Sequence, residues 1–177
     1  QAGDVSAYIP TNVISITDGQ IFLESSLFFS GQRPAVNVGL SVSRVGGAAQ
    51  TKAMKKVAGS IRVDLAQYRE MEVFTQFSSD LDDDTKEQLQ YGKGLMELLK
   101  QPLCQPLDMA EQVITLWTAT HKIFLNVEVK KIKETQKGML EYFKNAHPEI
   151  IAELNETKAL SDELGEKILA AAREYVK

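Results

Sequence analysis

The chain has 177 residues, a formal net charge of −4 and a hydrophobic content of 44%, values typical of one globular domain or two small ones. The acidic balance and the lack of a long basic block in the sequence disfavour nucleic acid as the main partner, because binding to the phosphate backbone requires a concentrated positive surface. No apolar run in the sequence approaches the ~20 residues of a membrane-spanning helix, the polar start does not predict a secretory leader, and the single cysteine, Cys104, excludes an internal disulfide and suits a reducing compartment.

Residues 1 to about 46 are expected to form strands and turns. Residues 12–17 are rich in β-branched side chains, and residues 20–24 form a second short apolar run. Asp18-Gly19 between them predicts a hairpin, because both residues tolerate the positive φ of a tight turn. Residues 36–42 predict a third strand. Three short strands without helices between them leave unpaired edges, so this half is expected to be the end of a larger domain.

From about residue 48 the apolar residues recur at steps of three and four, which predicts helices. The stripe of the first helix consists of Met54, Val57, Ile61, Leu65 and Tyr68. Five helices are expected, at about 48 to the acidic turn 78–84, at 84–99, after Asp108, at 127–145, and after Ser161.

Local signals support these limits. Asp108 followed by Glu111 resembles a capping box that opens the third helix, on which Val113, Trp117 and Phe124 are expected to pack. His147-Pro148 is expected to end the fourth helix. The predicted fold class is therefore α+β and mainly α, with a small sheet fragment followed by a bundle of five or six helices.

The common catalytic constellations are missing from the sequence. His121 and His147 have no cysteine or acidic partner at metal-ligand spacing, so no zinc site is expected. Cys104 lies between prolines without a nearby histidine, which favours an inert thiol. The sequence has no Gly-x-x-x-x-Gly-Lys-Ser/Thr loop, so the chain is not expected to hold ATP or act as an enzyme by itself.

Arg44 is the main candidate for chemistry. It lies between the apolar run 36–42 and a Gly46-Gly47 pair that is expected to open a helix. The residues alone leave two interpretations open. Arg44 is either a structural ion pair or a fixed guanidinium presented to a phosphate of a partner, a role worth roughly 10³–10⁵ in rate in other systems. The acidic turn 78–84 has two interpretations as well, a solvated helix cap or a contact for a basic partner.

Residues 34–50 closely resemble the signature of the α subunit of F-type ATP synthases. The similarity extends to residues 4–24, 31–35, 66–70, 77–82 and 98–101, and it is strong through about residue 113. Residues 37–46 fit α subunits better than the catalytic β subunits. The resemblance covers about the last third of a typical α subunit. It implies the terminal strands of a RecA-like nucleotide-binding domain at 1–47 and an α-helical C-terminal domain at 48–177.

The resemblance also implies roles for individual residues. Arg44 matches the arginine that an α subunit inserts into the catalytic site of the adjacent β subunit, facing the γ-phosphate. The residues that match positions near this catalytic interface are Ser15, Val42 and Ser43. The residues that match the adenine pocket of the α subunit's own, non-catalytic nucleotide are Arg33, Pro34 and Gln101. Those that match the contact with the central rotor stalk are Ser79, Asp80 and Asp82.

One departure from the family pattern concerns the adenine pocket. Many α subunits carry a second glutamine two residues after the first, whereas this chain has Leu103. The adenine pocket is therefore less well supported by the sequence than Arg44.

The implied function is that of a non-catalytic, regulatory ring subunit that couples ATP synthesis and hydrolysis to rotor rotation and proton transport. The implied ligands are ATP or ADP with Mg²⁺ in the intact assembly, with none bound tightly by this segment alone. The implied partners are β subunits, the central-stalk γ subunit and, through a preceding part, the peripheral-stalk δ subunit. Nucleic acid is not implied, and the membrane is contacted only indirectly, from the cytoplasmic face of a bacterial plasma membrane or the matrix or stromal face in an organelle.

Two other hypotheses remain. The chain could be a stand-alone helical interaction module without a nucleotide role, which the missing phosphate loop favours. It could instead belong to a related ring-shaped motor that acts on nucleic acid, which the acidic balance and the α-type signature disfavour.

Overall fold

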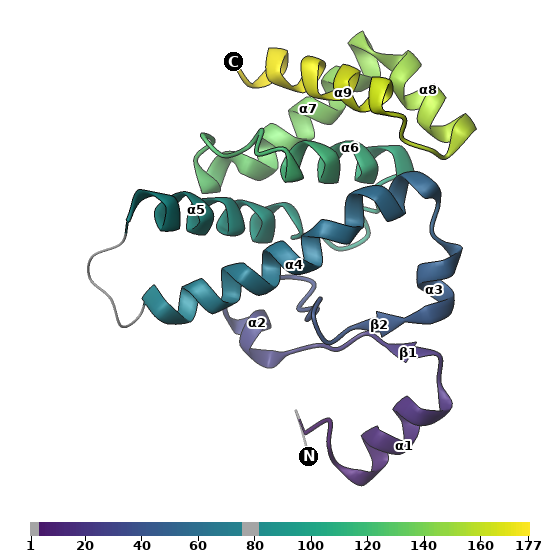
Figure 1. Cartoon of the computed structure of the whole chain (residues 1–177), viewed down its shortest axis with the longest axis vertical. Coiled ribbons are helices and arrows are strands. Elements are labelled where there is room, and N and C mark those ends of the chain that lie inside the picture. The colour runs from purple at the N-terminus through teal and green to yellow at the C-terminus, as the bar shows by residue number, and fades with distance from the viewer. Residues whose placement is uncertain (1–3, 76–81) are drawn as a thin grey trace. The chain divides into compact units, whose positions relative to one another are not determined.

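The computed structural model describes residues 4–75 and 82–177 (Figure 1). The chain divides into two compact units. The first consists of Gln1–Gln50 with Lys100–Pro102, and the second of Thr51–Leu99 with Leu103–Lys177. The mainly helical α+β class predicted from the sequence is confirmed. Within the described ranges, no helix has both the length and the apolar character needed to cross a bilayer.

The first unit combines short helices with a two-stranded antiparallel sheet. The strands β1 (Gly19–Gln20) and β2 (Val42–Ser43) pair Gly19 with Ser43 and Gln20 with Val42. An isolated bridge joins Leu23 to Val36. The helices of this unit are α1 (Tyr8–Ile16), α2 (Ser25–Phe29) and α3 (Arg44–Ala49).

The strand predicted at residues 12–17 is wrong, because residues 12–16 lie in α1 and Thr17 is its C-cap. A helix satisfies its backbone hydrogen bonds internally, whereas a strand needs a neighbouring strand. Hydroxyl groups add to the helical bonding, since Thr11 Oγ1 donates to the carbonyl of Ala7 (2.8 Å) and Ser15 Oγ to that of Asn12 (2.7 Å). The predicted hairpin is therefore also wrong: β1 pairs with β2, far along the chain, and not with residues 12–17.

A turn around Asn37 replaces most of the third predicted strand. Asn37 is only 4% exposed. Its backbone N–H donates to the carbonyl of Phe22 (2.8 Å), and its side-chain Nδ2 donates to Glu24 Oε1 (2.8 Å). Its Oδ1 accepts from the N–H of Leu40 (3.1 Å). These bonds turn the chain between Val36 and β2, so the strand is reduced to its two ends.

The second unit is helical. Its helices are α4 (Lys52–Thr75), α5 (Asp83–Leu98), α6 (Met109–Thr120), the short 3-10 helix η1 (Val129–Lys131), α7 (Ile132–Ala146), α8 (Pro148–Thr157) and α9 (Asp162–Val176). Helix α6 contacts α4, α5, α7, α8 and α9 and so forms the centre of this unit (Figure 1). The largest fully buried side chains include Val57, Ile114, Phe143, Leu154 and Ile168.

Most of the helical prediction is confirmed. Val57, Ile61, Leu65 and Tyr68 of the α4 stripe are buried. The predicted capping of α6 is present, since the N–H of Asp108 donates to Glu111 Oε2 (2.9 Å).

Three details of the helical prediction are wrong. Phe124 follows α6 and does not lie on it, although its side chain is buried. The fourth predicted helix divides into η1 and α7. The sequence does not predict helix α8, because His147-Pro148 indicates only the end of the preceding helix. Pro148 instead opens α8, a position where its missing N–H costs nothing.

Candidate functional site

Arg44 is the first residue of α3, and its side chain is exposed. The residues on both sides of it are held by side-chain hydrogen bonds. Asp18 Oδ2 accepts from Ser43 Oγ (2.7 Å) and from the N–H of Val45 (3.1 Å). Ser43 Oγ in turn accepts from the N–H of Gly46 (2.9 Å) and caps α3. Asp18, the residue before β1, thus fixes the main chain on both sides of Arg44, while the Arg44 side chain is exposed to solvent.

Gly46 has a specific steric role at this site. A Cβ atom added at Gly46 would lie 2.7 Å from Ser43 Oγ, closer than side-chain carbons approach oxygen. A larger residue would therefore disturb the cap of α3. The sequence predicts that the glycine pair opens the helix, but α3 begins two residues before Gly46, at Arg44, and contains both glycines.

The predicted interface residues differ in their placement. Val42 and Ser43 form β2 and lead directly into Arg44. Ser15 lies in the last turn of α1 and bonds the carbonyl of Asn12 in its own helix. The structure therefore joins two of these three residues to Arg44 through the backbone, and places the third on a separate helix.

The predicted adenine-pocket residues come together in the first unit. The backbone N–H of Gln101 donates to the carbonyl of Arg33 (2.9 Å), and the Arg33–Pro34 peptide bond is cis. The Arg33 guanidinium lies over the Phe28 ring, 4.4 Å from its centroid. Leu103 is 91% exposed. This brings the two ends of the predicted pocket, far apart in sequence, into contact.

Among the predicted rotor contacts, Ser79 and Asp80 lie outside the described residues. Asp82 is the N-cap of α5, where its Oδ1 accepts from the N–H of Thr85 (3.2 Å). Hydrogen bonds from the side chain and backbone of Thr85 lower the pKa of Asp82. Capping α5 is therefore the role that the geometry of Asp82 shows, and the rotor contact stays a prediction.

The histidines and the cysteine belong to the second unit. His121 Nδ1 is 2.8 Å from the carbonyl of Trp117, and its ring packs 4.1 Å from that indole. His147 Nδ1 lies 3.2 Å from Glu149 Oε1, and Cys104 is an exposed free thiol. In the part of the chain that the structure describes, no group of three or more His, Cys, Asp or Glu side chains could hold a metal ion.

The sequence interpretation missed the role of Asp18. It used Asp18-Gly19 only as a turn signal, although an aspartate carboxylate also accepts hydrogen bonds from nearby backbone and hydroxyl donors. The sequence could not show that those donors would be Ser43 and Val45, because the pairing of β1 with β2 brings them there.

Comparison with known proteins identifies the family. Residues 50–175 match the family described as "ATP synthase alpha/beta chain, C terminal domain". The chain belongs to this family. Residues 1–43 match the "ATP synthase alpha/beta family, nucleotide-binding domain". Arg44 follows directly after that second match. The predicted boundary between residues 47 and 48 stays a prediction.

Individual relatives give the subunit type. The chain is 55% identical over 175 residues to "ATP synthase subunit alpha" of Caldanaerobacter subterraneus subsp. tengcongensis, an alignment that covers 99% of this chain and 35% of the relative. It is 54% identical over 176 residues to the protein of the same name from Clostridium kluyveri, with coverage of 99% and 35%. The chain thus spans about a third of the length of the curated relatives it matches. The resemblance to the C-terminal part of an α subunit is confirmed.

Proposed function

We propose that this chain acts as the C-terminal part of an ATP synthase α subunit and donates Arg44 to the catalytic site of an adjacent β subunit. The observation that carries the proposal is the construction around Arg44. Its side chain is exposed, whereas Asp18 and Ser43 hold the backbone on both sides of it.

The chemistry of Arg44 follows from its guanidinium group. A guanidinium carries a positive charge and five N–H donors in a planar arrangement that suits phosphate oxygens. A donor group that is already positioned stabilises the charge that develops on a transferring phosphoryl group without a reorganisation cost. In this proposal ATP and Mg²⁺ occupy the site of the β subunit, and Arg44 contributes only positive charge and hydrogen bonds.

Arg33, Pro34 and Gln101 form, in the same proposal, one side of the adenine pocket of a second, non-catalytic nucleotide. The backbone bond between Gln101 and Arg33 supports this role, because it places both residues at one location. The phosphates of that nucleotide would be bound by the part of the α subunit that precedes this chain.

The helical unit, in this proposal, responds to nucleotide state and contacts the γ subunit of the rotor through residues 78–84, including Ser79, Asp80 and Asp82. Coupling requires that nucleotide contacts favour one of two helical positions that the rotor also distinguishes. The δ subunit, a peripheral position at the membrane, and proton transport belong to the complete assembly.

The test is replacement of Arg44 in an assembled enzyme. We expect Arg44→Ala to lower ATP turnover by about 10³-fold or more, while nucleotide binding is largely retained. Arg173→Ala is the matched control, since Arg173 is exposed in the last turn of α9. Turnover at the wild-type level in the Arg44 variant would exclude the proposed role.

A second experiment addresses the alternative of a stand-alone helical module. The α subunit that carries this segment is mixed with β subunits, and the mixture is analysed by size-exclusion chromatography with light scattering. The proposal predicts an αβ complex. Failure to form one under conditions in which both proteins are folded would favour the helical module.

A further inference from the structure

A groove in the second unit is lined by residues other than Arg44 and the adenine-pocket residues. It encloses about 310 Å³, at the lower end of the range of small-molecule sites. Its walls come from one face of α4, from α5 and from the end of α6. The side chains that give it chemical character are Asp64, Gln67, Met71, Gln88, Tyr91 and Lys122.

Two negative charges and one positive charge lie in or beside the groove, namely those of Asp64, Glu87 and Lys122. Its two charged wall residues are Asp64 and Lys122. The ammonium of Lys122 is bound by Glu87, which is not a wall residue, at 2.6 Å. Asp64 Oδ2 accepts from the hydroxyl of Tyr91 (2.8 Å), which is neutral. A carboxylate can accept about four hydrogen bonds, so the bond from Tyr91 leaves Asp64 further acceptor capacity toward the groove.

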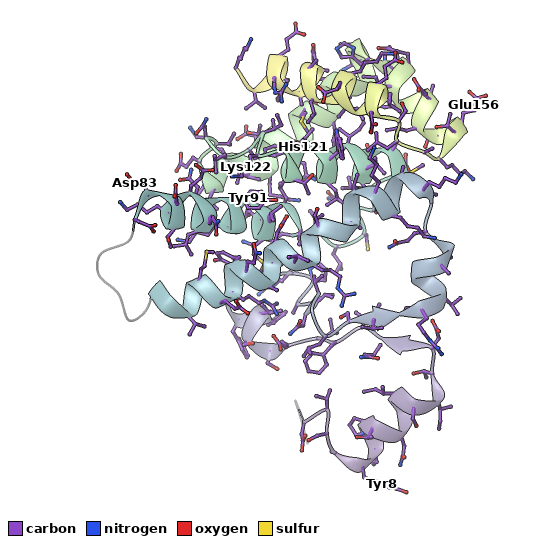
Figure 2. The ribbon with its side chains drawn as sticks, in the orientation of Figure 1. Tyr8, Asp83, Tyr91, His121, Lys122 and Glu156 are labelled. Carbon is purple, nitrogen blue, oxygen red and sulfur yellow. The ribbon has the colours of Figure 1, made fainter. Side chains whose placement is uncertain are left out.

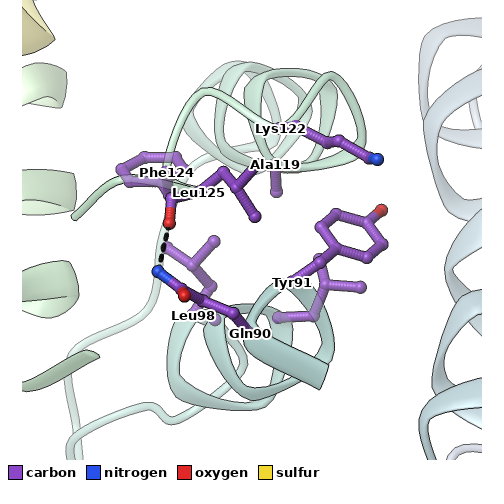
Figure 3. A pocket seen from close by; sticks show the side chains of 9 residues that line it. Gln90, Tyr91, Leu98, Ala119, Lys122, Phe124 and Leu125 are labelled. Carbon is purple, nitrogen blue, oxygen red and sulfur yellow. Dashed lines mark hydrogen bonds between the residues drawn. The ribbon is translucent and has the colours of Figure 1, made fainter. Parts of the chain in front are cut away.

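Tyr91 lines both this groove and a smaller cavity, and Figure 3 shows the smaller cavity. That cavity holds about 10 Å³, roughly the space of one water, and its other walls are mainly apolar, including Leu98 and Phe124. Lys122 Nζ lies 5.9 Å from the centroid of the Tyr91 ring, and Figure 2 shows both side chains between α5 and the end of α6. Burial, followed by the bond to Asp64, raises the pKa of Tyr91, which therefore stays a hydroxyl donor.

We propose that this groove binds a small organic cation, an amidinium or guanidinium group on a short apolar body, with Asp64 as its counter-ion. The planar cation donates to the Asp64 carboxylate, and the amide oxygens of Gln67 and Gln88 can accept further N–H bonds. The apolar body contacts Met71 and the exposed part of Tyr91. This proposal is independent of the role of Arg44, and nucleotide turnover does not test it.

The experiment uses benzamidine, which combines an amidinium with one ring, and its neutral analogue benzamide. Each is titrated into the ¹⁵N-labelled 177-residue chain, and amide shifts are followed by NMR. We expect saturable shifts for benzamidine at amides of α4 and α5 around Asp64 and Tyr91, with binding at least about tenfold tighter than that of benzamide.

Three variants make the test specific. Asp64→Asn is expected to weaken benzamidine at least about tenfold, whereas Asp84→Asn, at the exposed start of α5, leaves binding unchanged. Tyr91→Phe removes the hydroxyl that donates to Asp64 but keeps the aromatic ring, so benzamidine binding is retained or becomes tighter. The absence of saturable binding, equal affinity for benzamide, or equal affinity in the folded Asp64→Asn variant would each overturn the proposal.

Discussion

Asp18 and Ser43 act on Arg44 without contacting the group that Arg44 is proposed to bind. Asp18 accepts two hydrogen bonds from the residues on either side of Arg44, and Ser43 caps the helix that Arg44 opens. A typical hydrogen bond contributes about 0.5–1.5 kcal/mol to stability. The position of Arg44 is therefore maintained by interactions of modest strength, which single substitutions can remove.

The hydrogen bonds of Asp18 can be tested by substitution. Asp18→Ala is expected to lower ATP turnover of an assembled enzyme through misplacement of Arg44, and Asp18→Asn, which retains one acceptor oxygen, is expected to restore part of it. The decisive measurement is a double-mutant cycle. In the Arg44→Ala background, Asp18→Ala should cause little further loss, because the residue it positions is already gone. Additive losses would show that Asp18 acts elsewhere.

At the scale of elements, the contact between α4 and α5 depends on a glycine. A Cβ atom added at Gly92 would lie 2.2 Å from the Tyr68 ring, a severe overlap between the two helices. Gly59 in α4 has no atom within 4 Å of such a position. The chain therefore contains two helical glycines with opposite expected responses to the same substitution.

We predict that Gly92→Ala lowers the free energy of unfolding by about 1–3 kcal/mol through overpacking. Gly59→Ala is expected to raise it by up to about 1 kcal/mol, since alanine favours helix over glycine. Thermal and urea denaturation of both variants provide the measurement. Equal effects of the two substitutions would mean that the α4–α5 contact relaxes freely.

An ion pair between Glu111 and Lys144 links α6 to α7. Lys144 Nζ lies 2.5 Å from Glu111 Oε1, whose side chain is 10% exposed. Burial acts to raise the pKa of Glu111, but hydrogen bonds from Lys144 and the Asp108 N–H outweigh it and lower the pKa below 4.5. The hydrogen bond and charge of Glu111 raise the pKa of Lys144.

A carboxylate with a lowered pKa stabilises the folded state above its unfolded-state pKa, and this stabilisation is lost as the pH falls through the folded-state value. We therefore expect Glu111→Gln to reduce stability at pH 7, and the difference from wild type to shrink as the pH falls below about 4.5. Glu163→Gln, in the exposed pair Glu163–Lys167, is the control and should change stability little. Urea denaturation at several pH values gives the comparison.

The elements also show where sequence-based prediction succeeds. Helices α5, α6 and α9 are determined by local signals, namely an N-cap aspartate or serine followed by apolar residues at helical spacing. Residues 12–17 lack such local determination. Their β-branched side chains favour a strand only if another strand is available for pairing, and α1 forms in its place here. The pairing of β1 with β2, and hence the brace at Asp18, could not be predicted because it joins distant residues.

At the scale of the whole molecule, the two units differ in how well they bury apolar side chains. In the first unit Tyr8, Ile16 and Phe29 are 82%, 83% and 84% exposed. In the second unit, residues such as Ile114, Phe143 and Ile168 are fully buried. Exposed apolar surface of this extent favours association. The first unit thus carries surface that other polypeptide would cover in the proposed assembly.

We predict that the 177-residue chain self-associates with increasing concentration and that a variant limited to residues 51–177 does not. Analytical ultracentrifugation of both proteins measures the difference. The shorter protein should also retain a cooperative thermal transition, because the buried helical core lies within it. If the two proteins associate equally, the surface responsible for self-association lies in the helical unit.

The backbone passes between the units at three places, after Gln50, after Leu99 and after Pro102, because the tripeptide Lys100–Pro102 belongs with the first unit. A protease that cuts the chain after Gln50 would therefore leave one segment of the first unit, Lys100–Pro102, covalently joined to the helical unit. The amide of Gln101 would still donate to the carbonyl of Arg33, so the severed piece would keep a contact with the remainder, and native size-exclusion chromatography after the cut measures how tightly it is held.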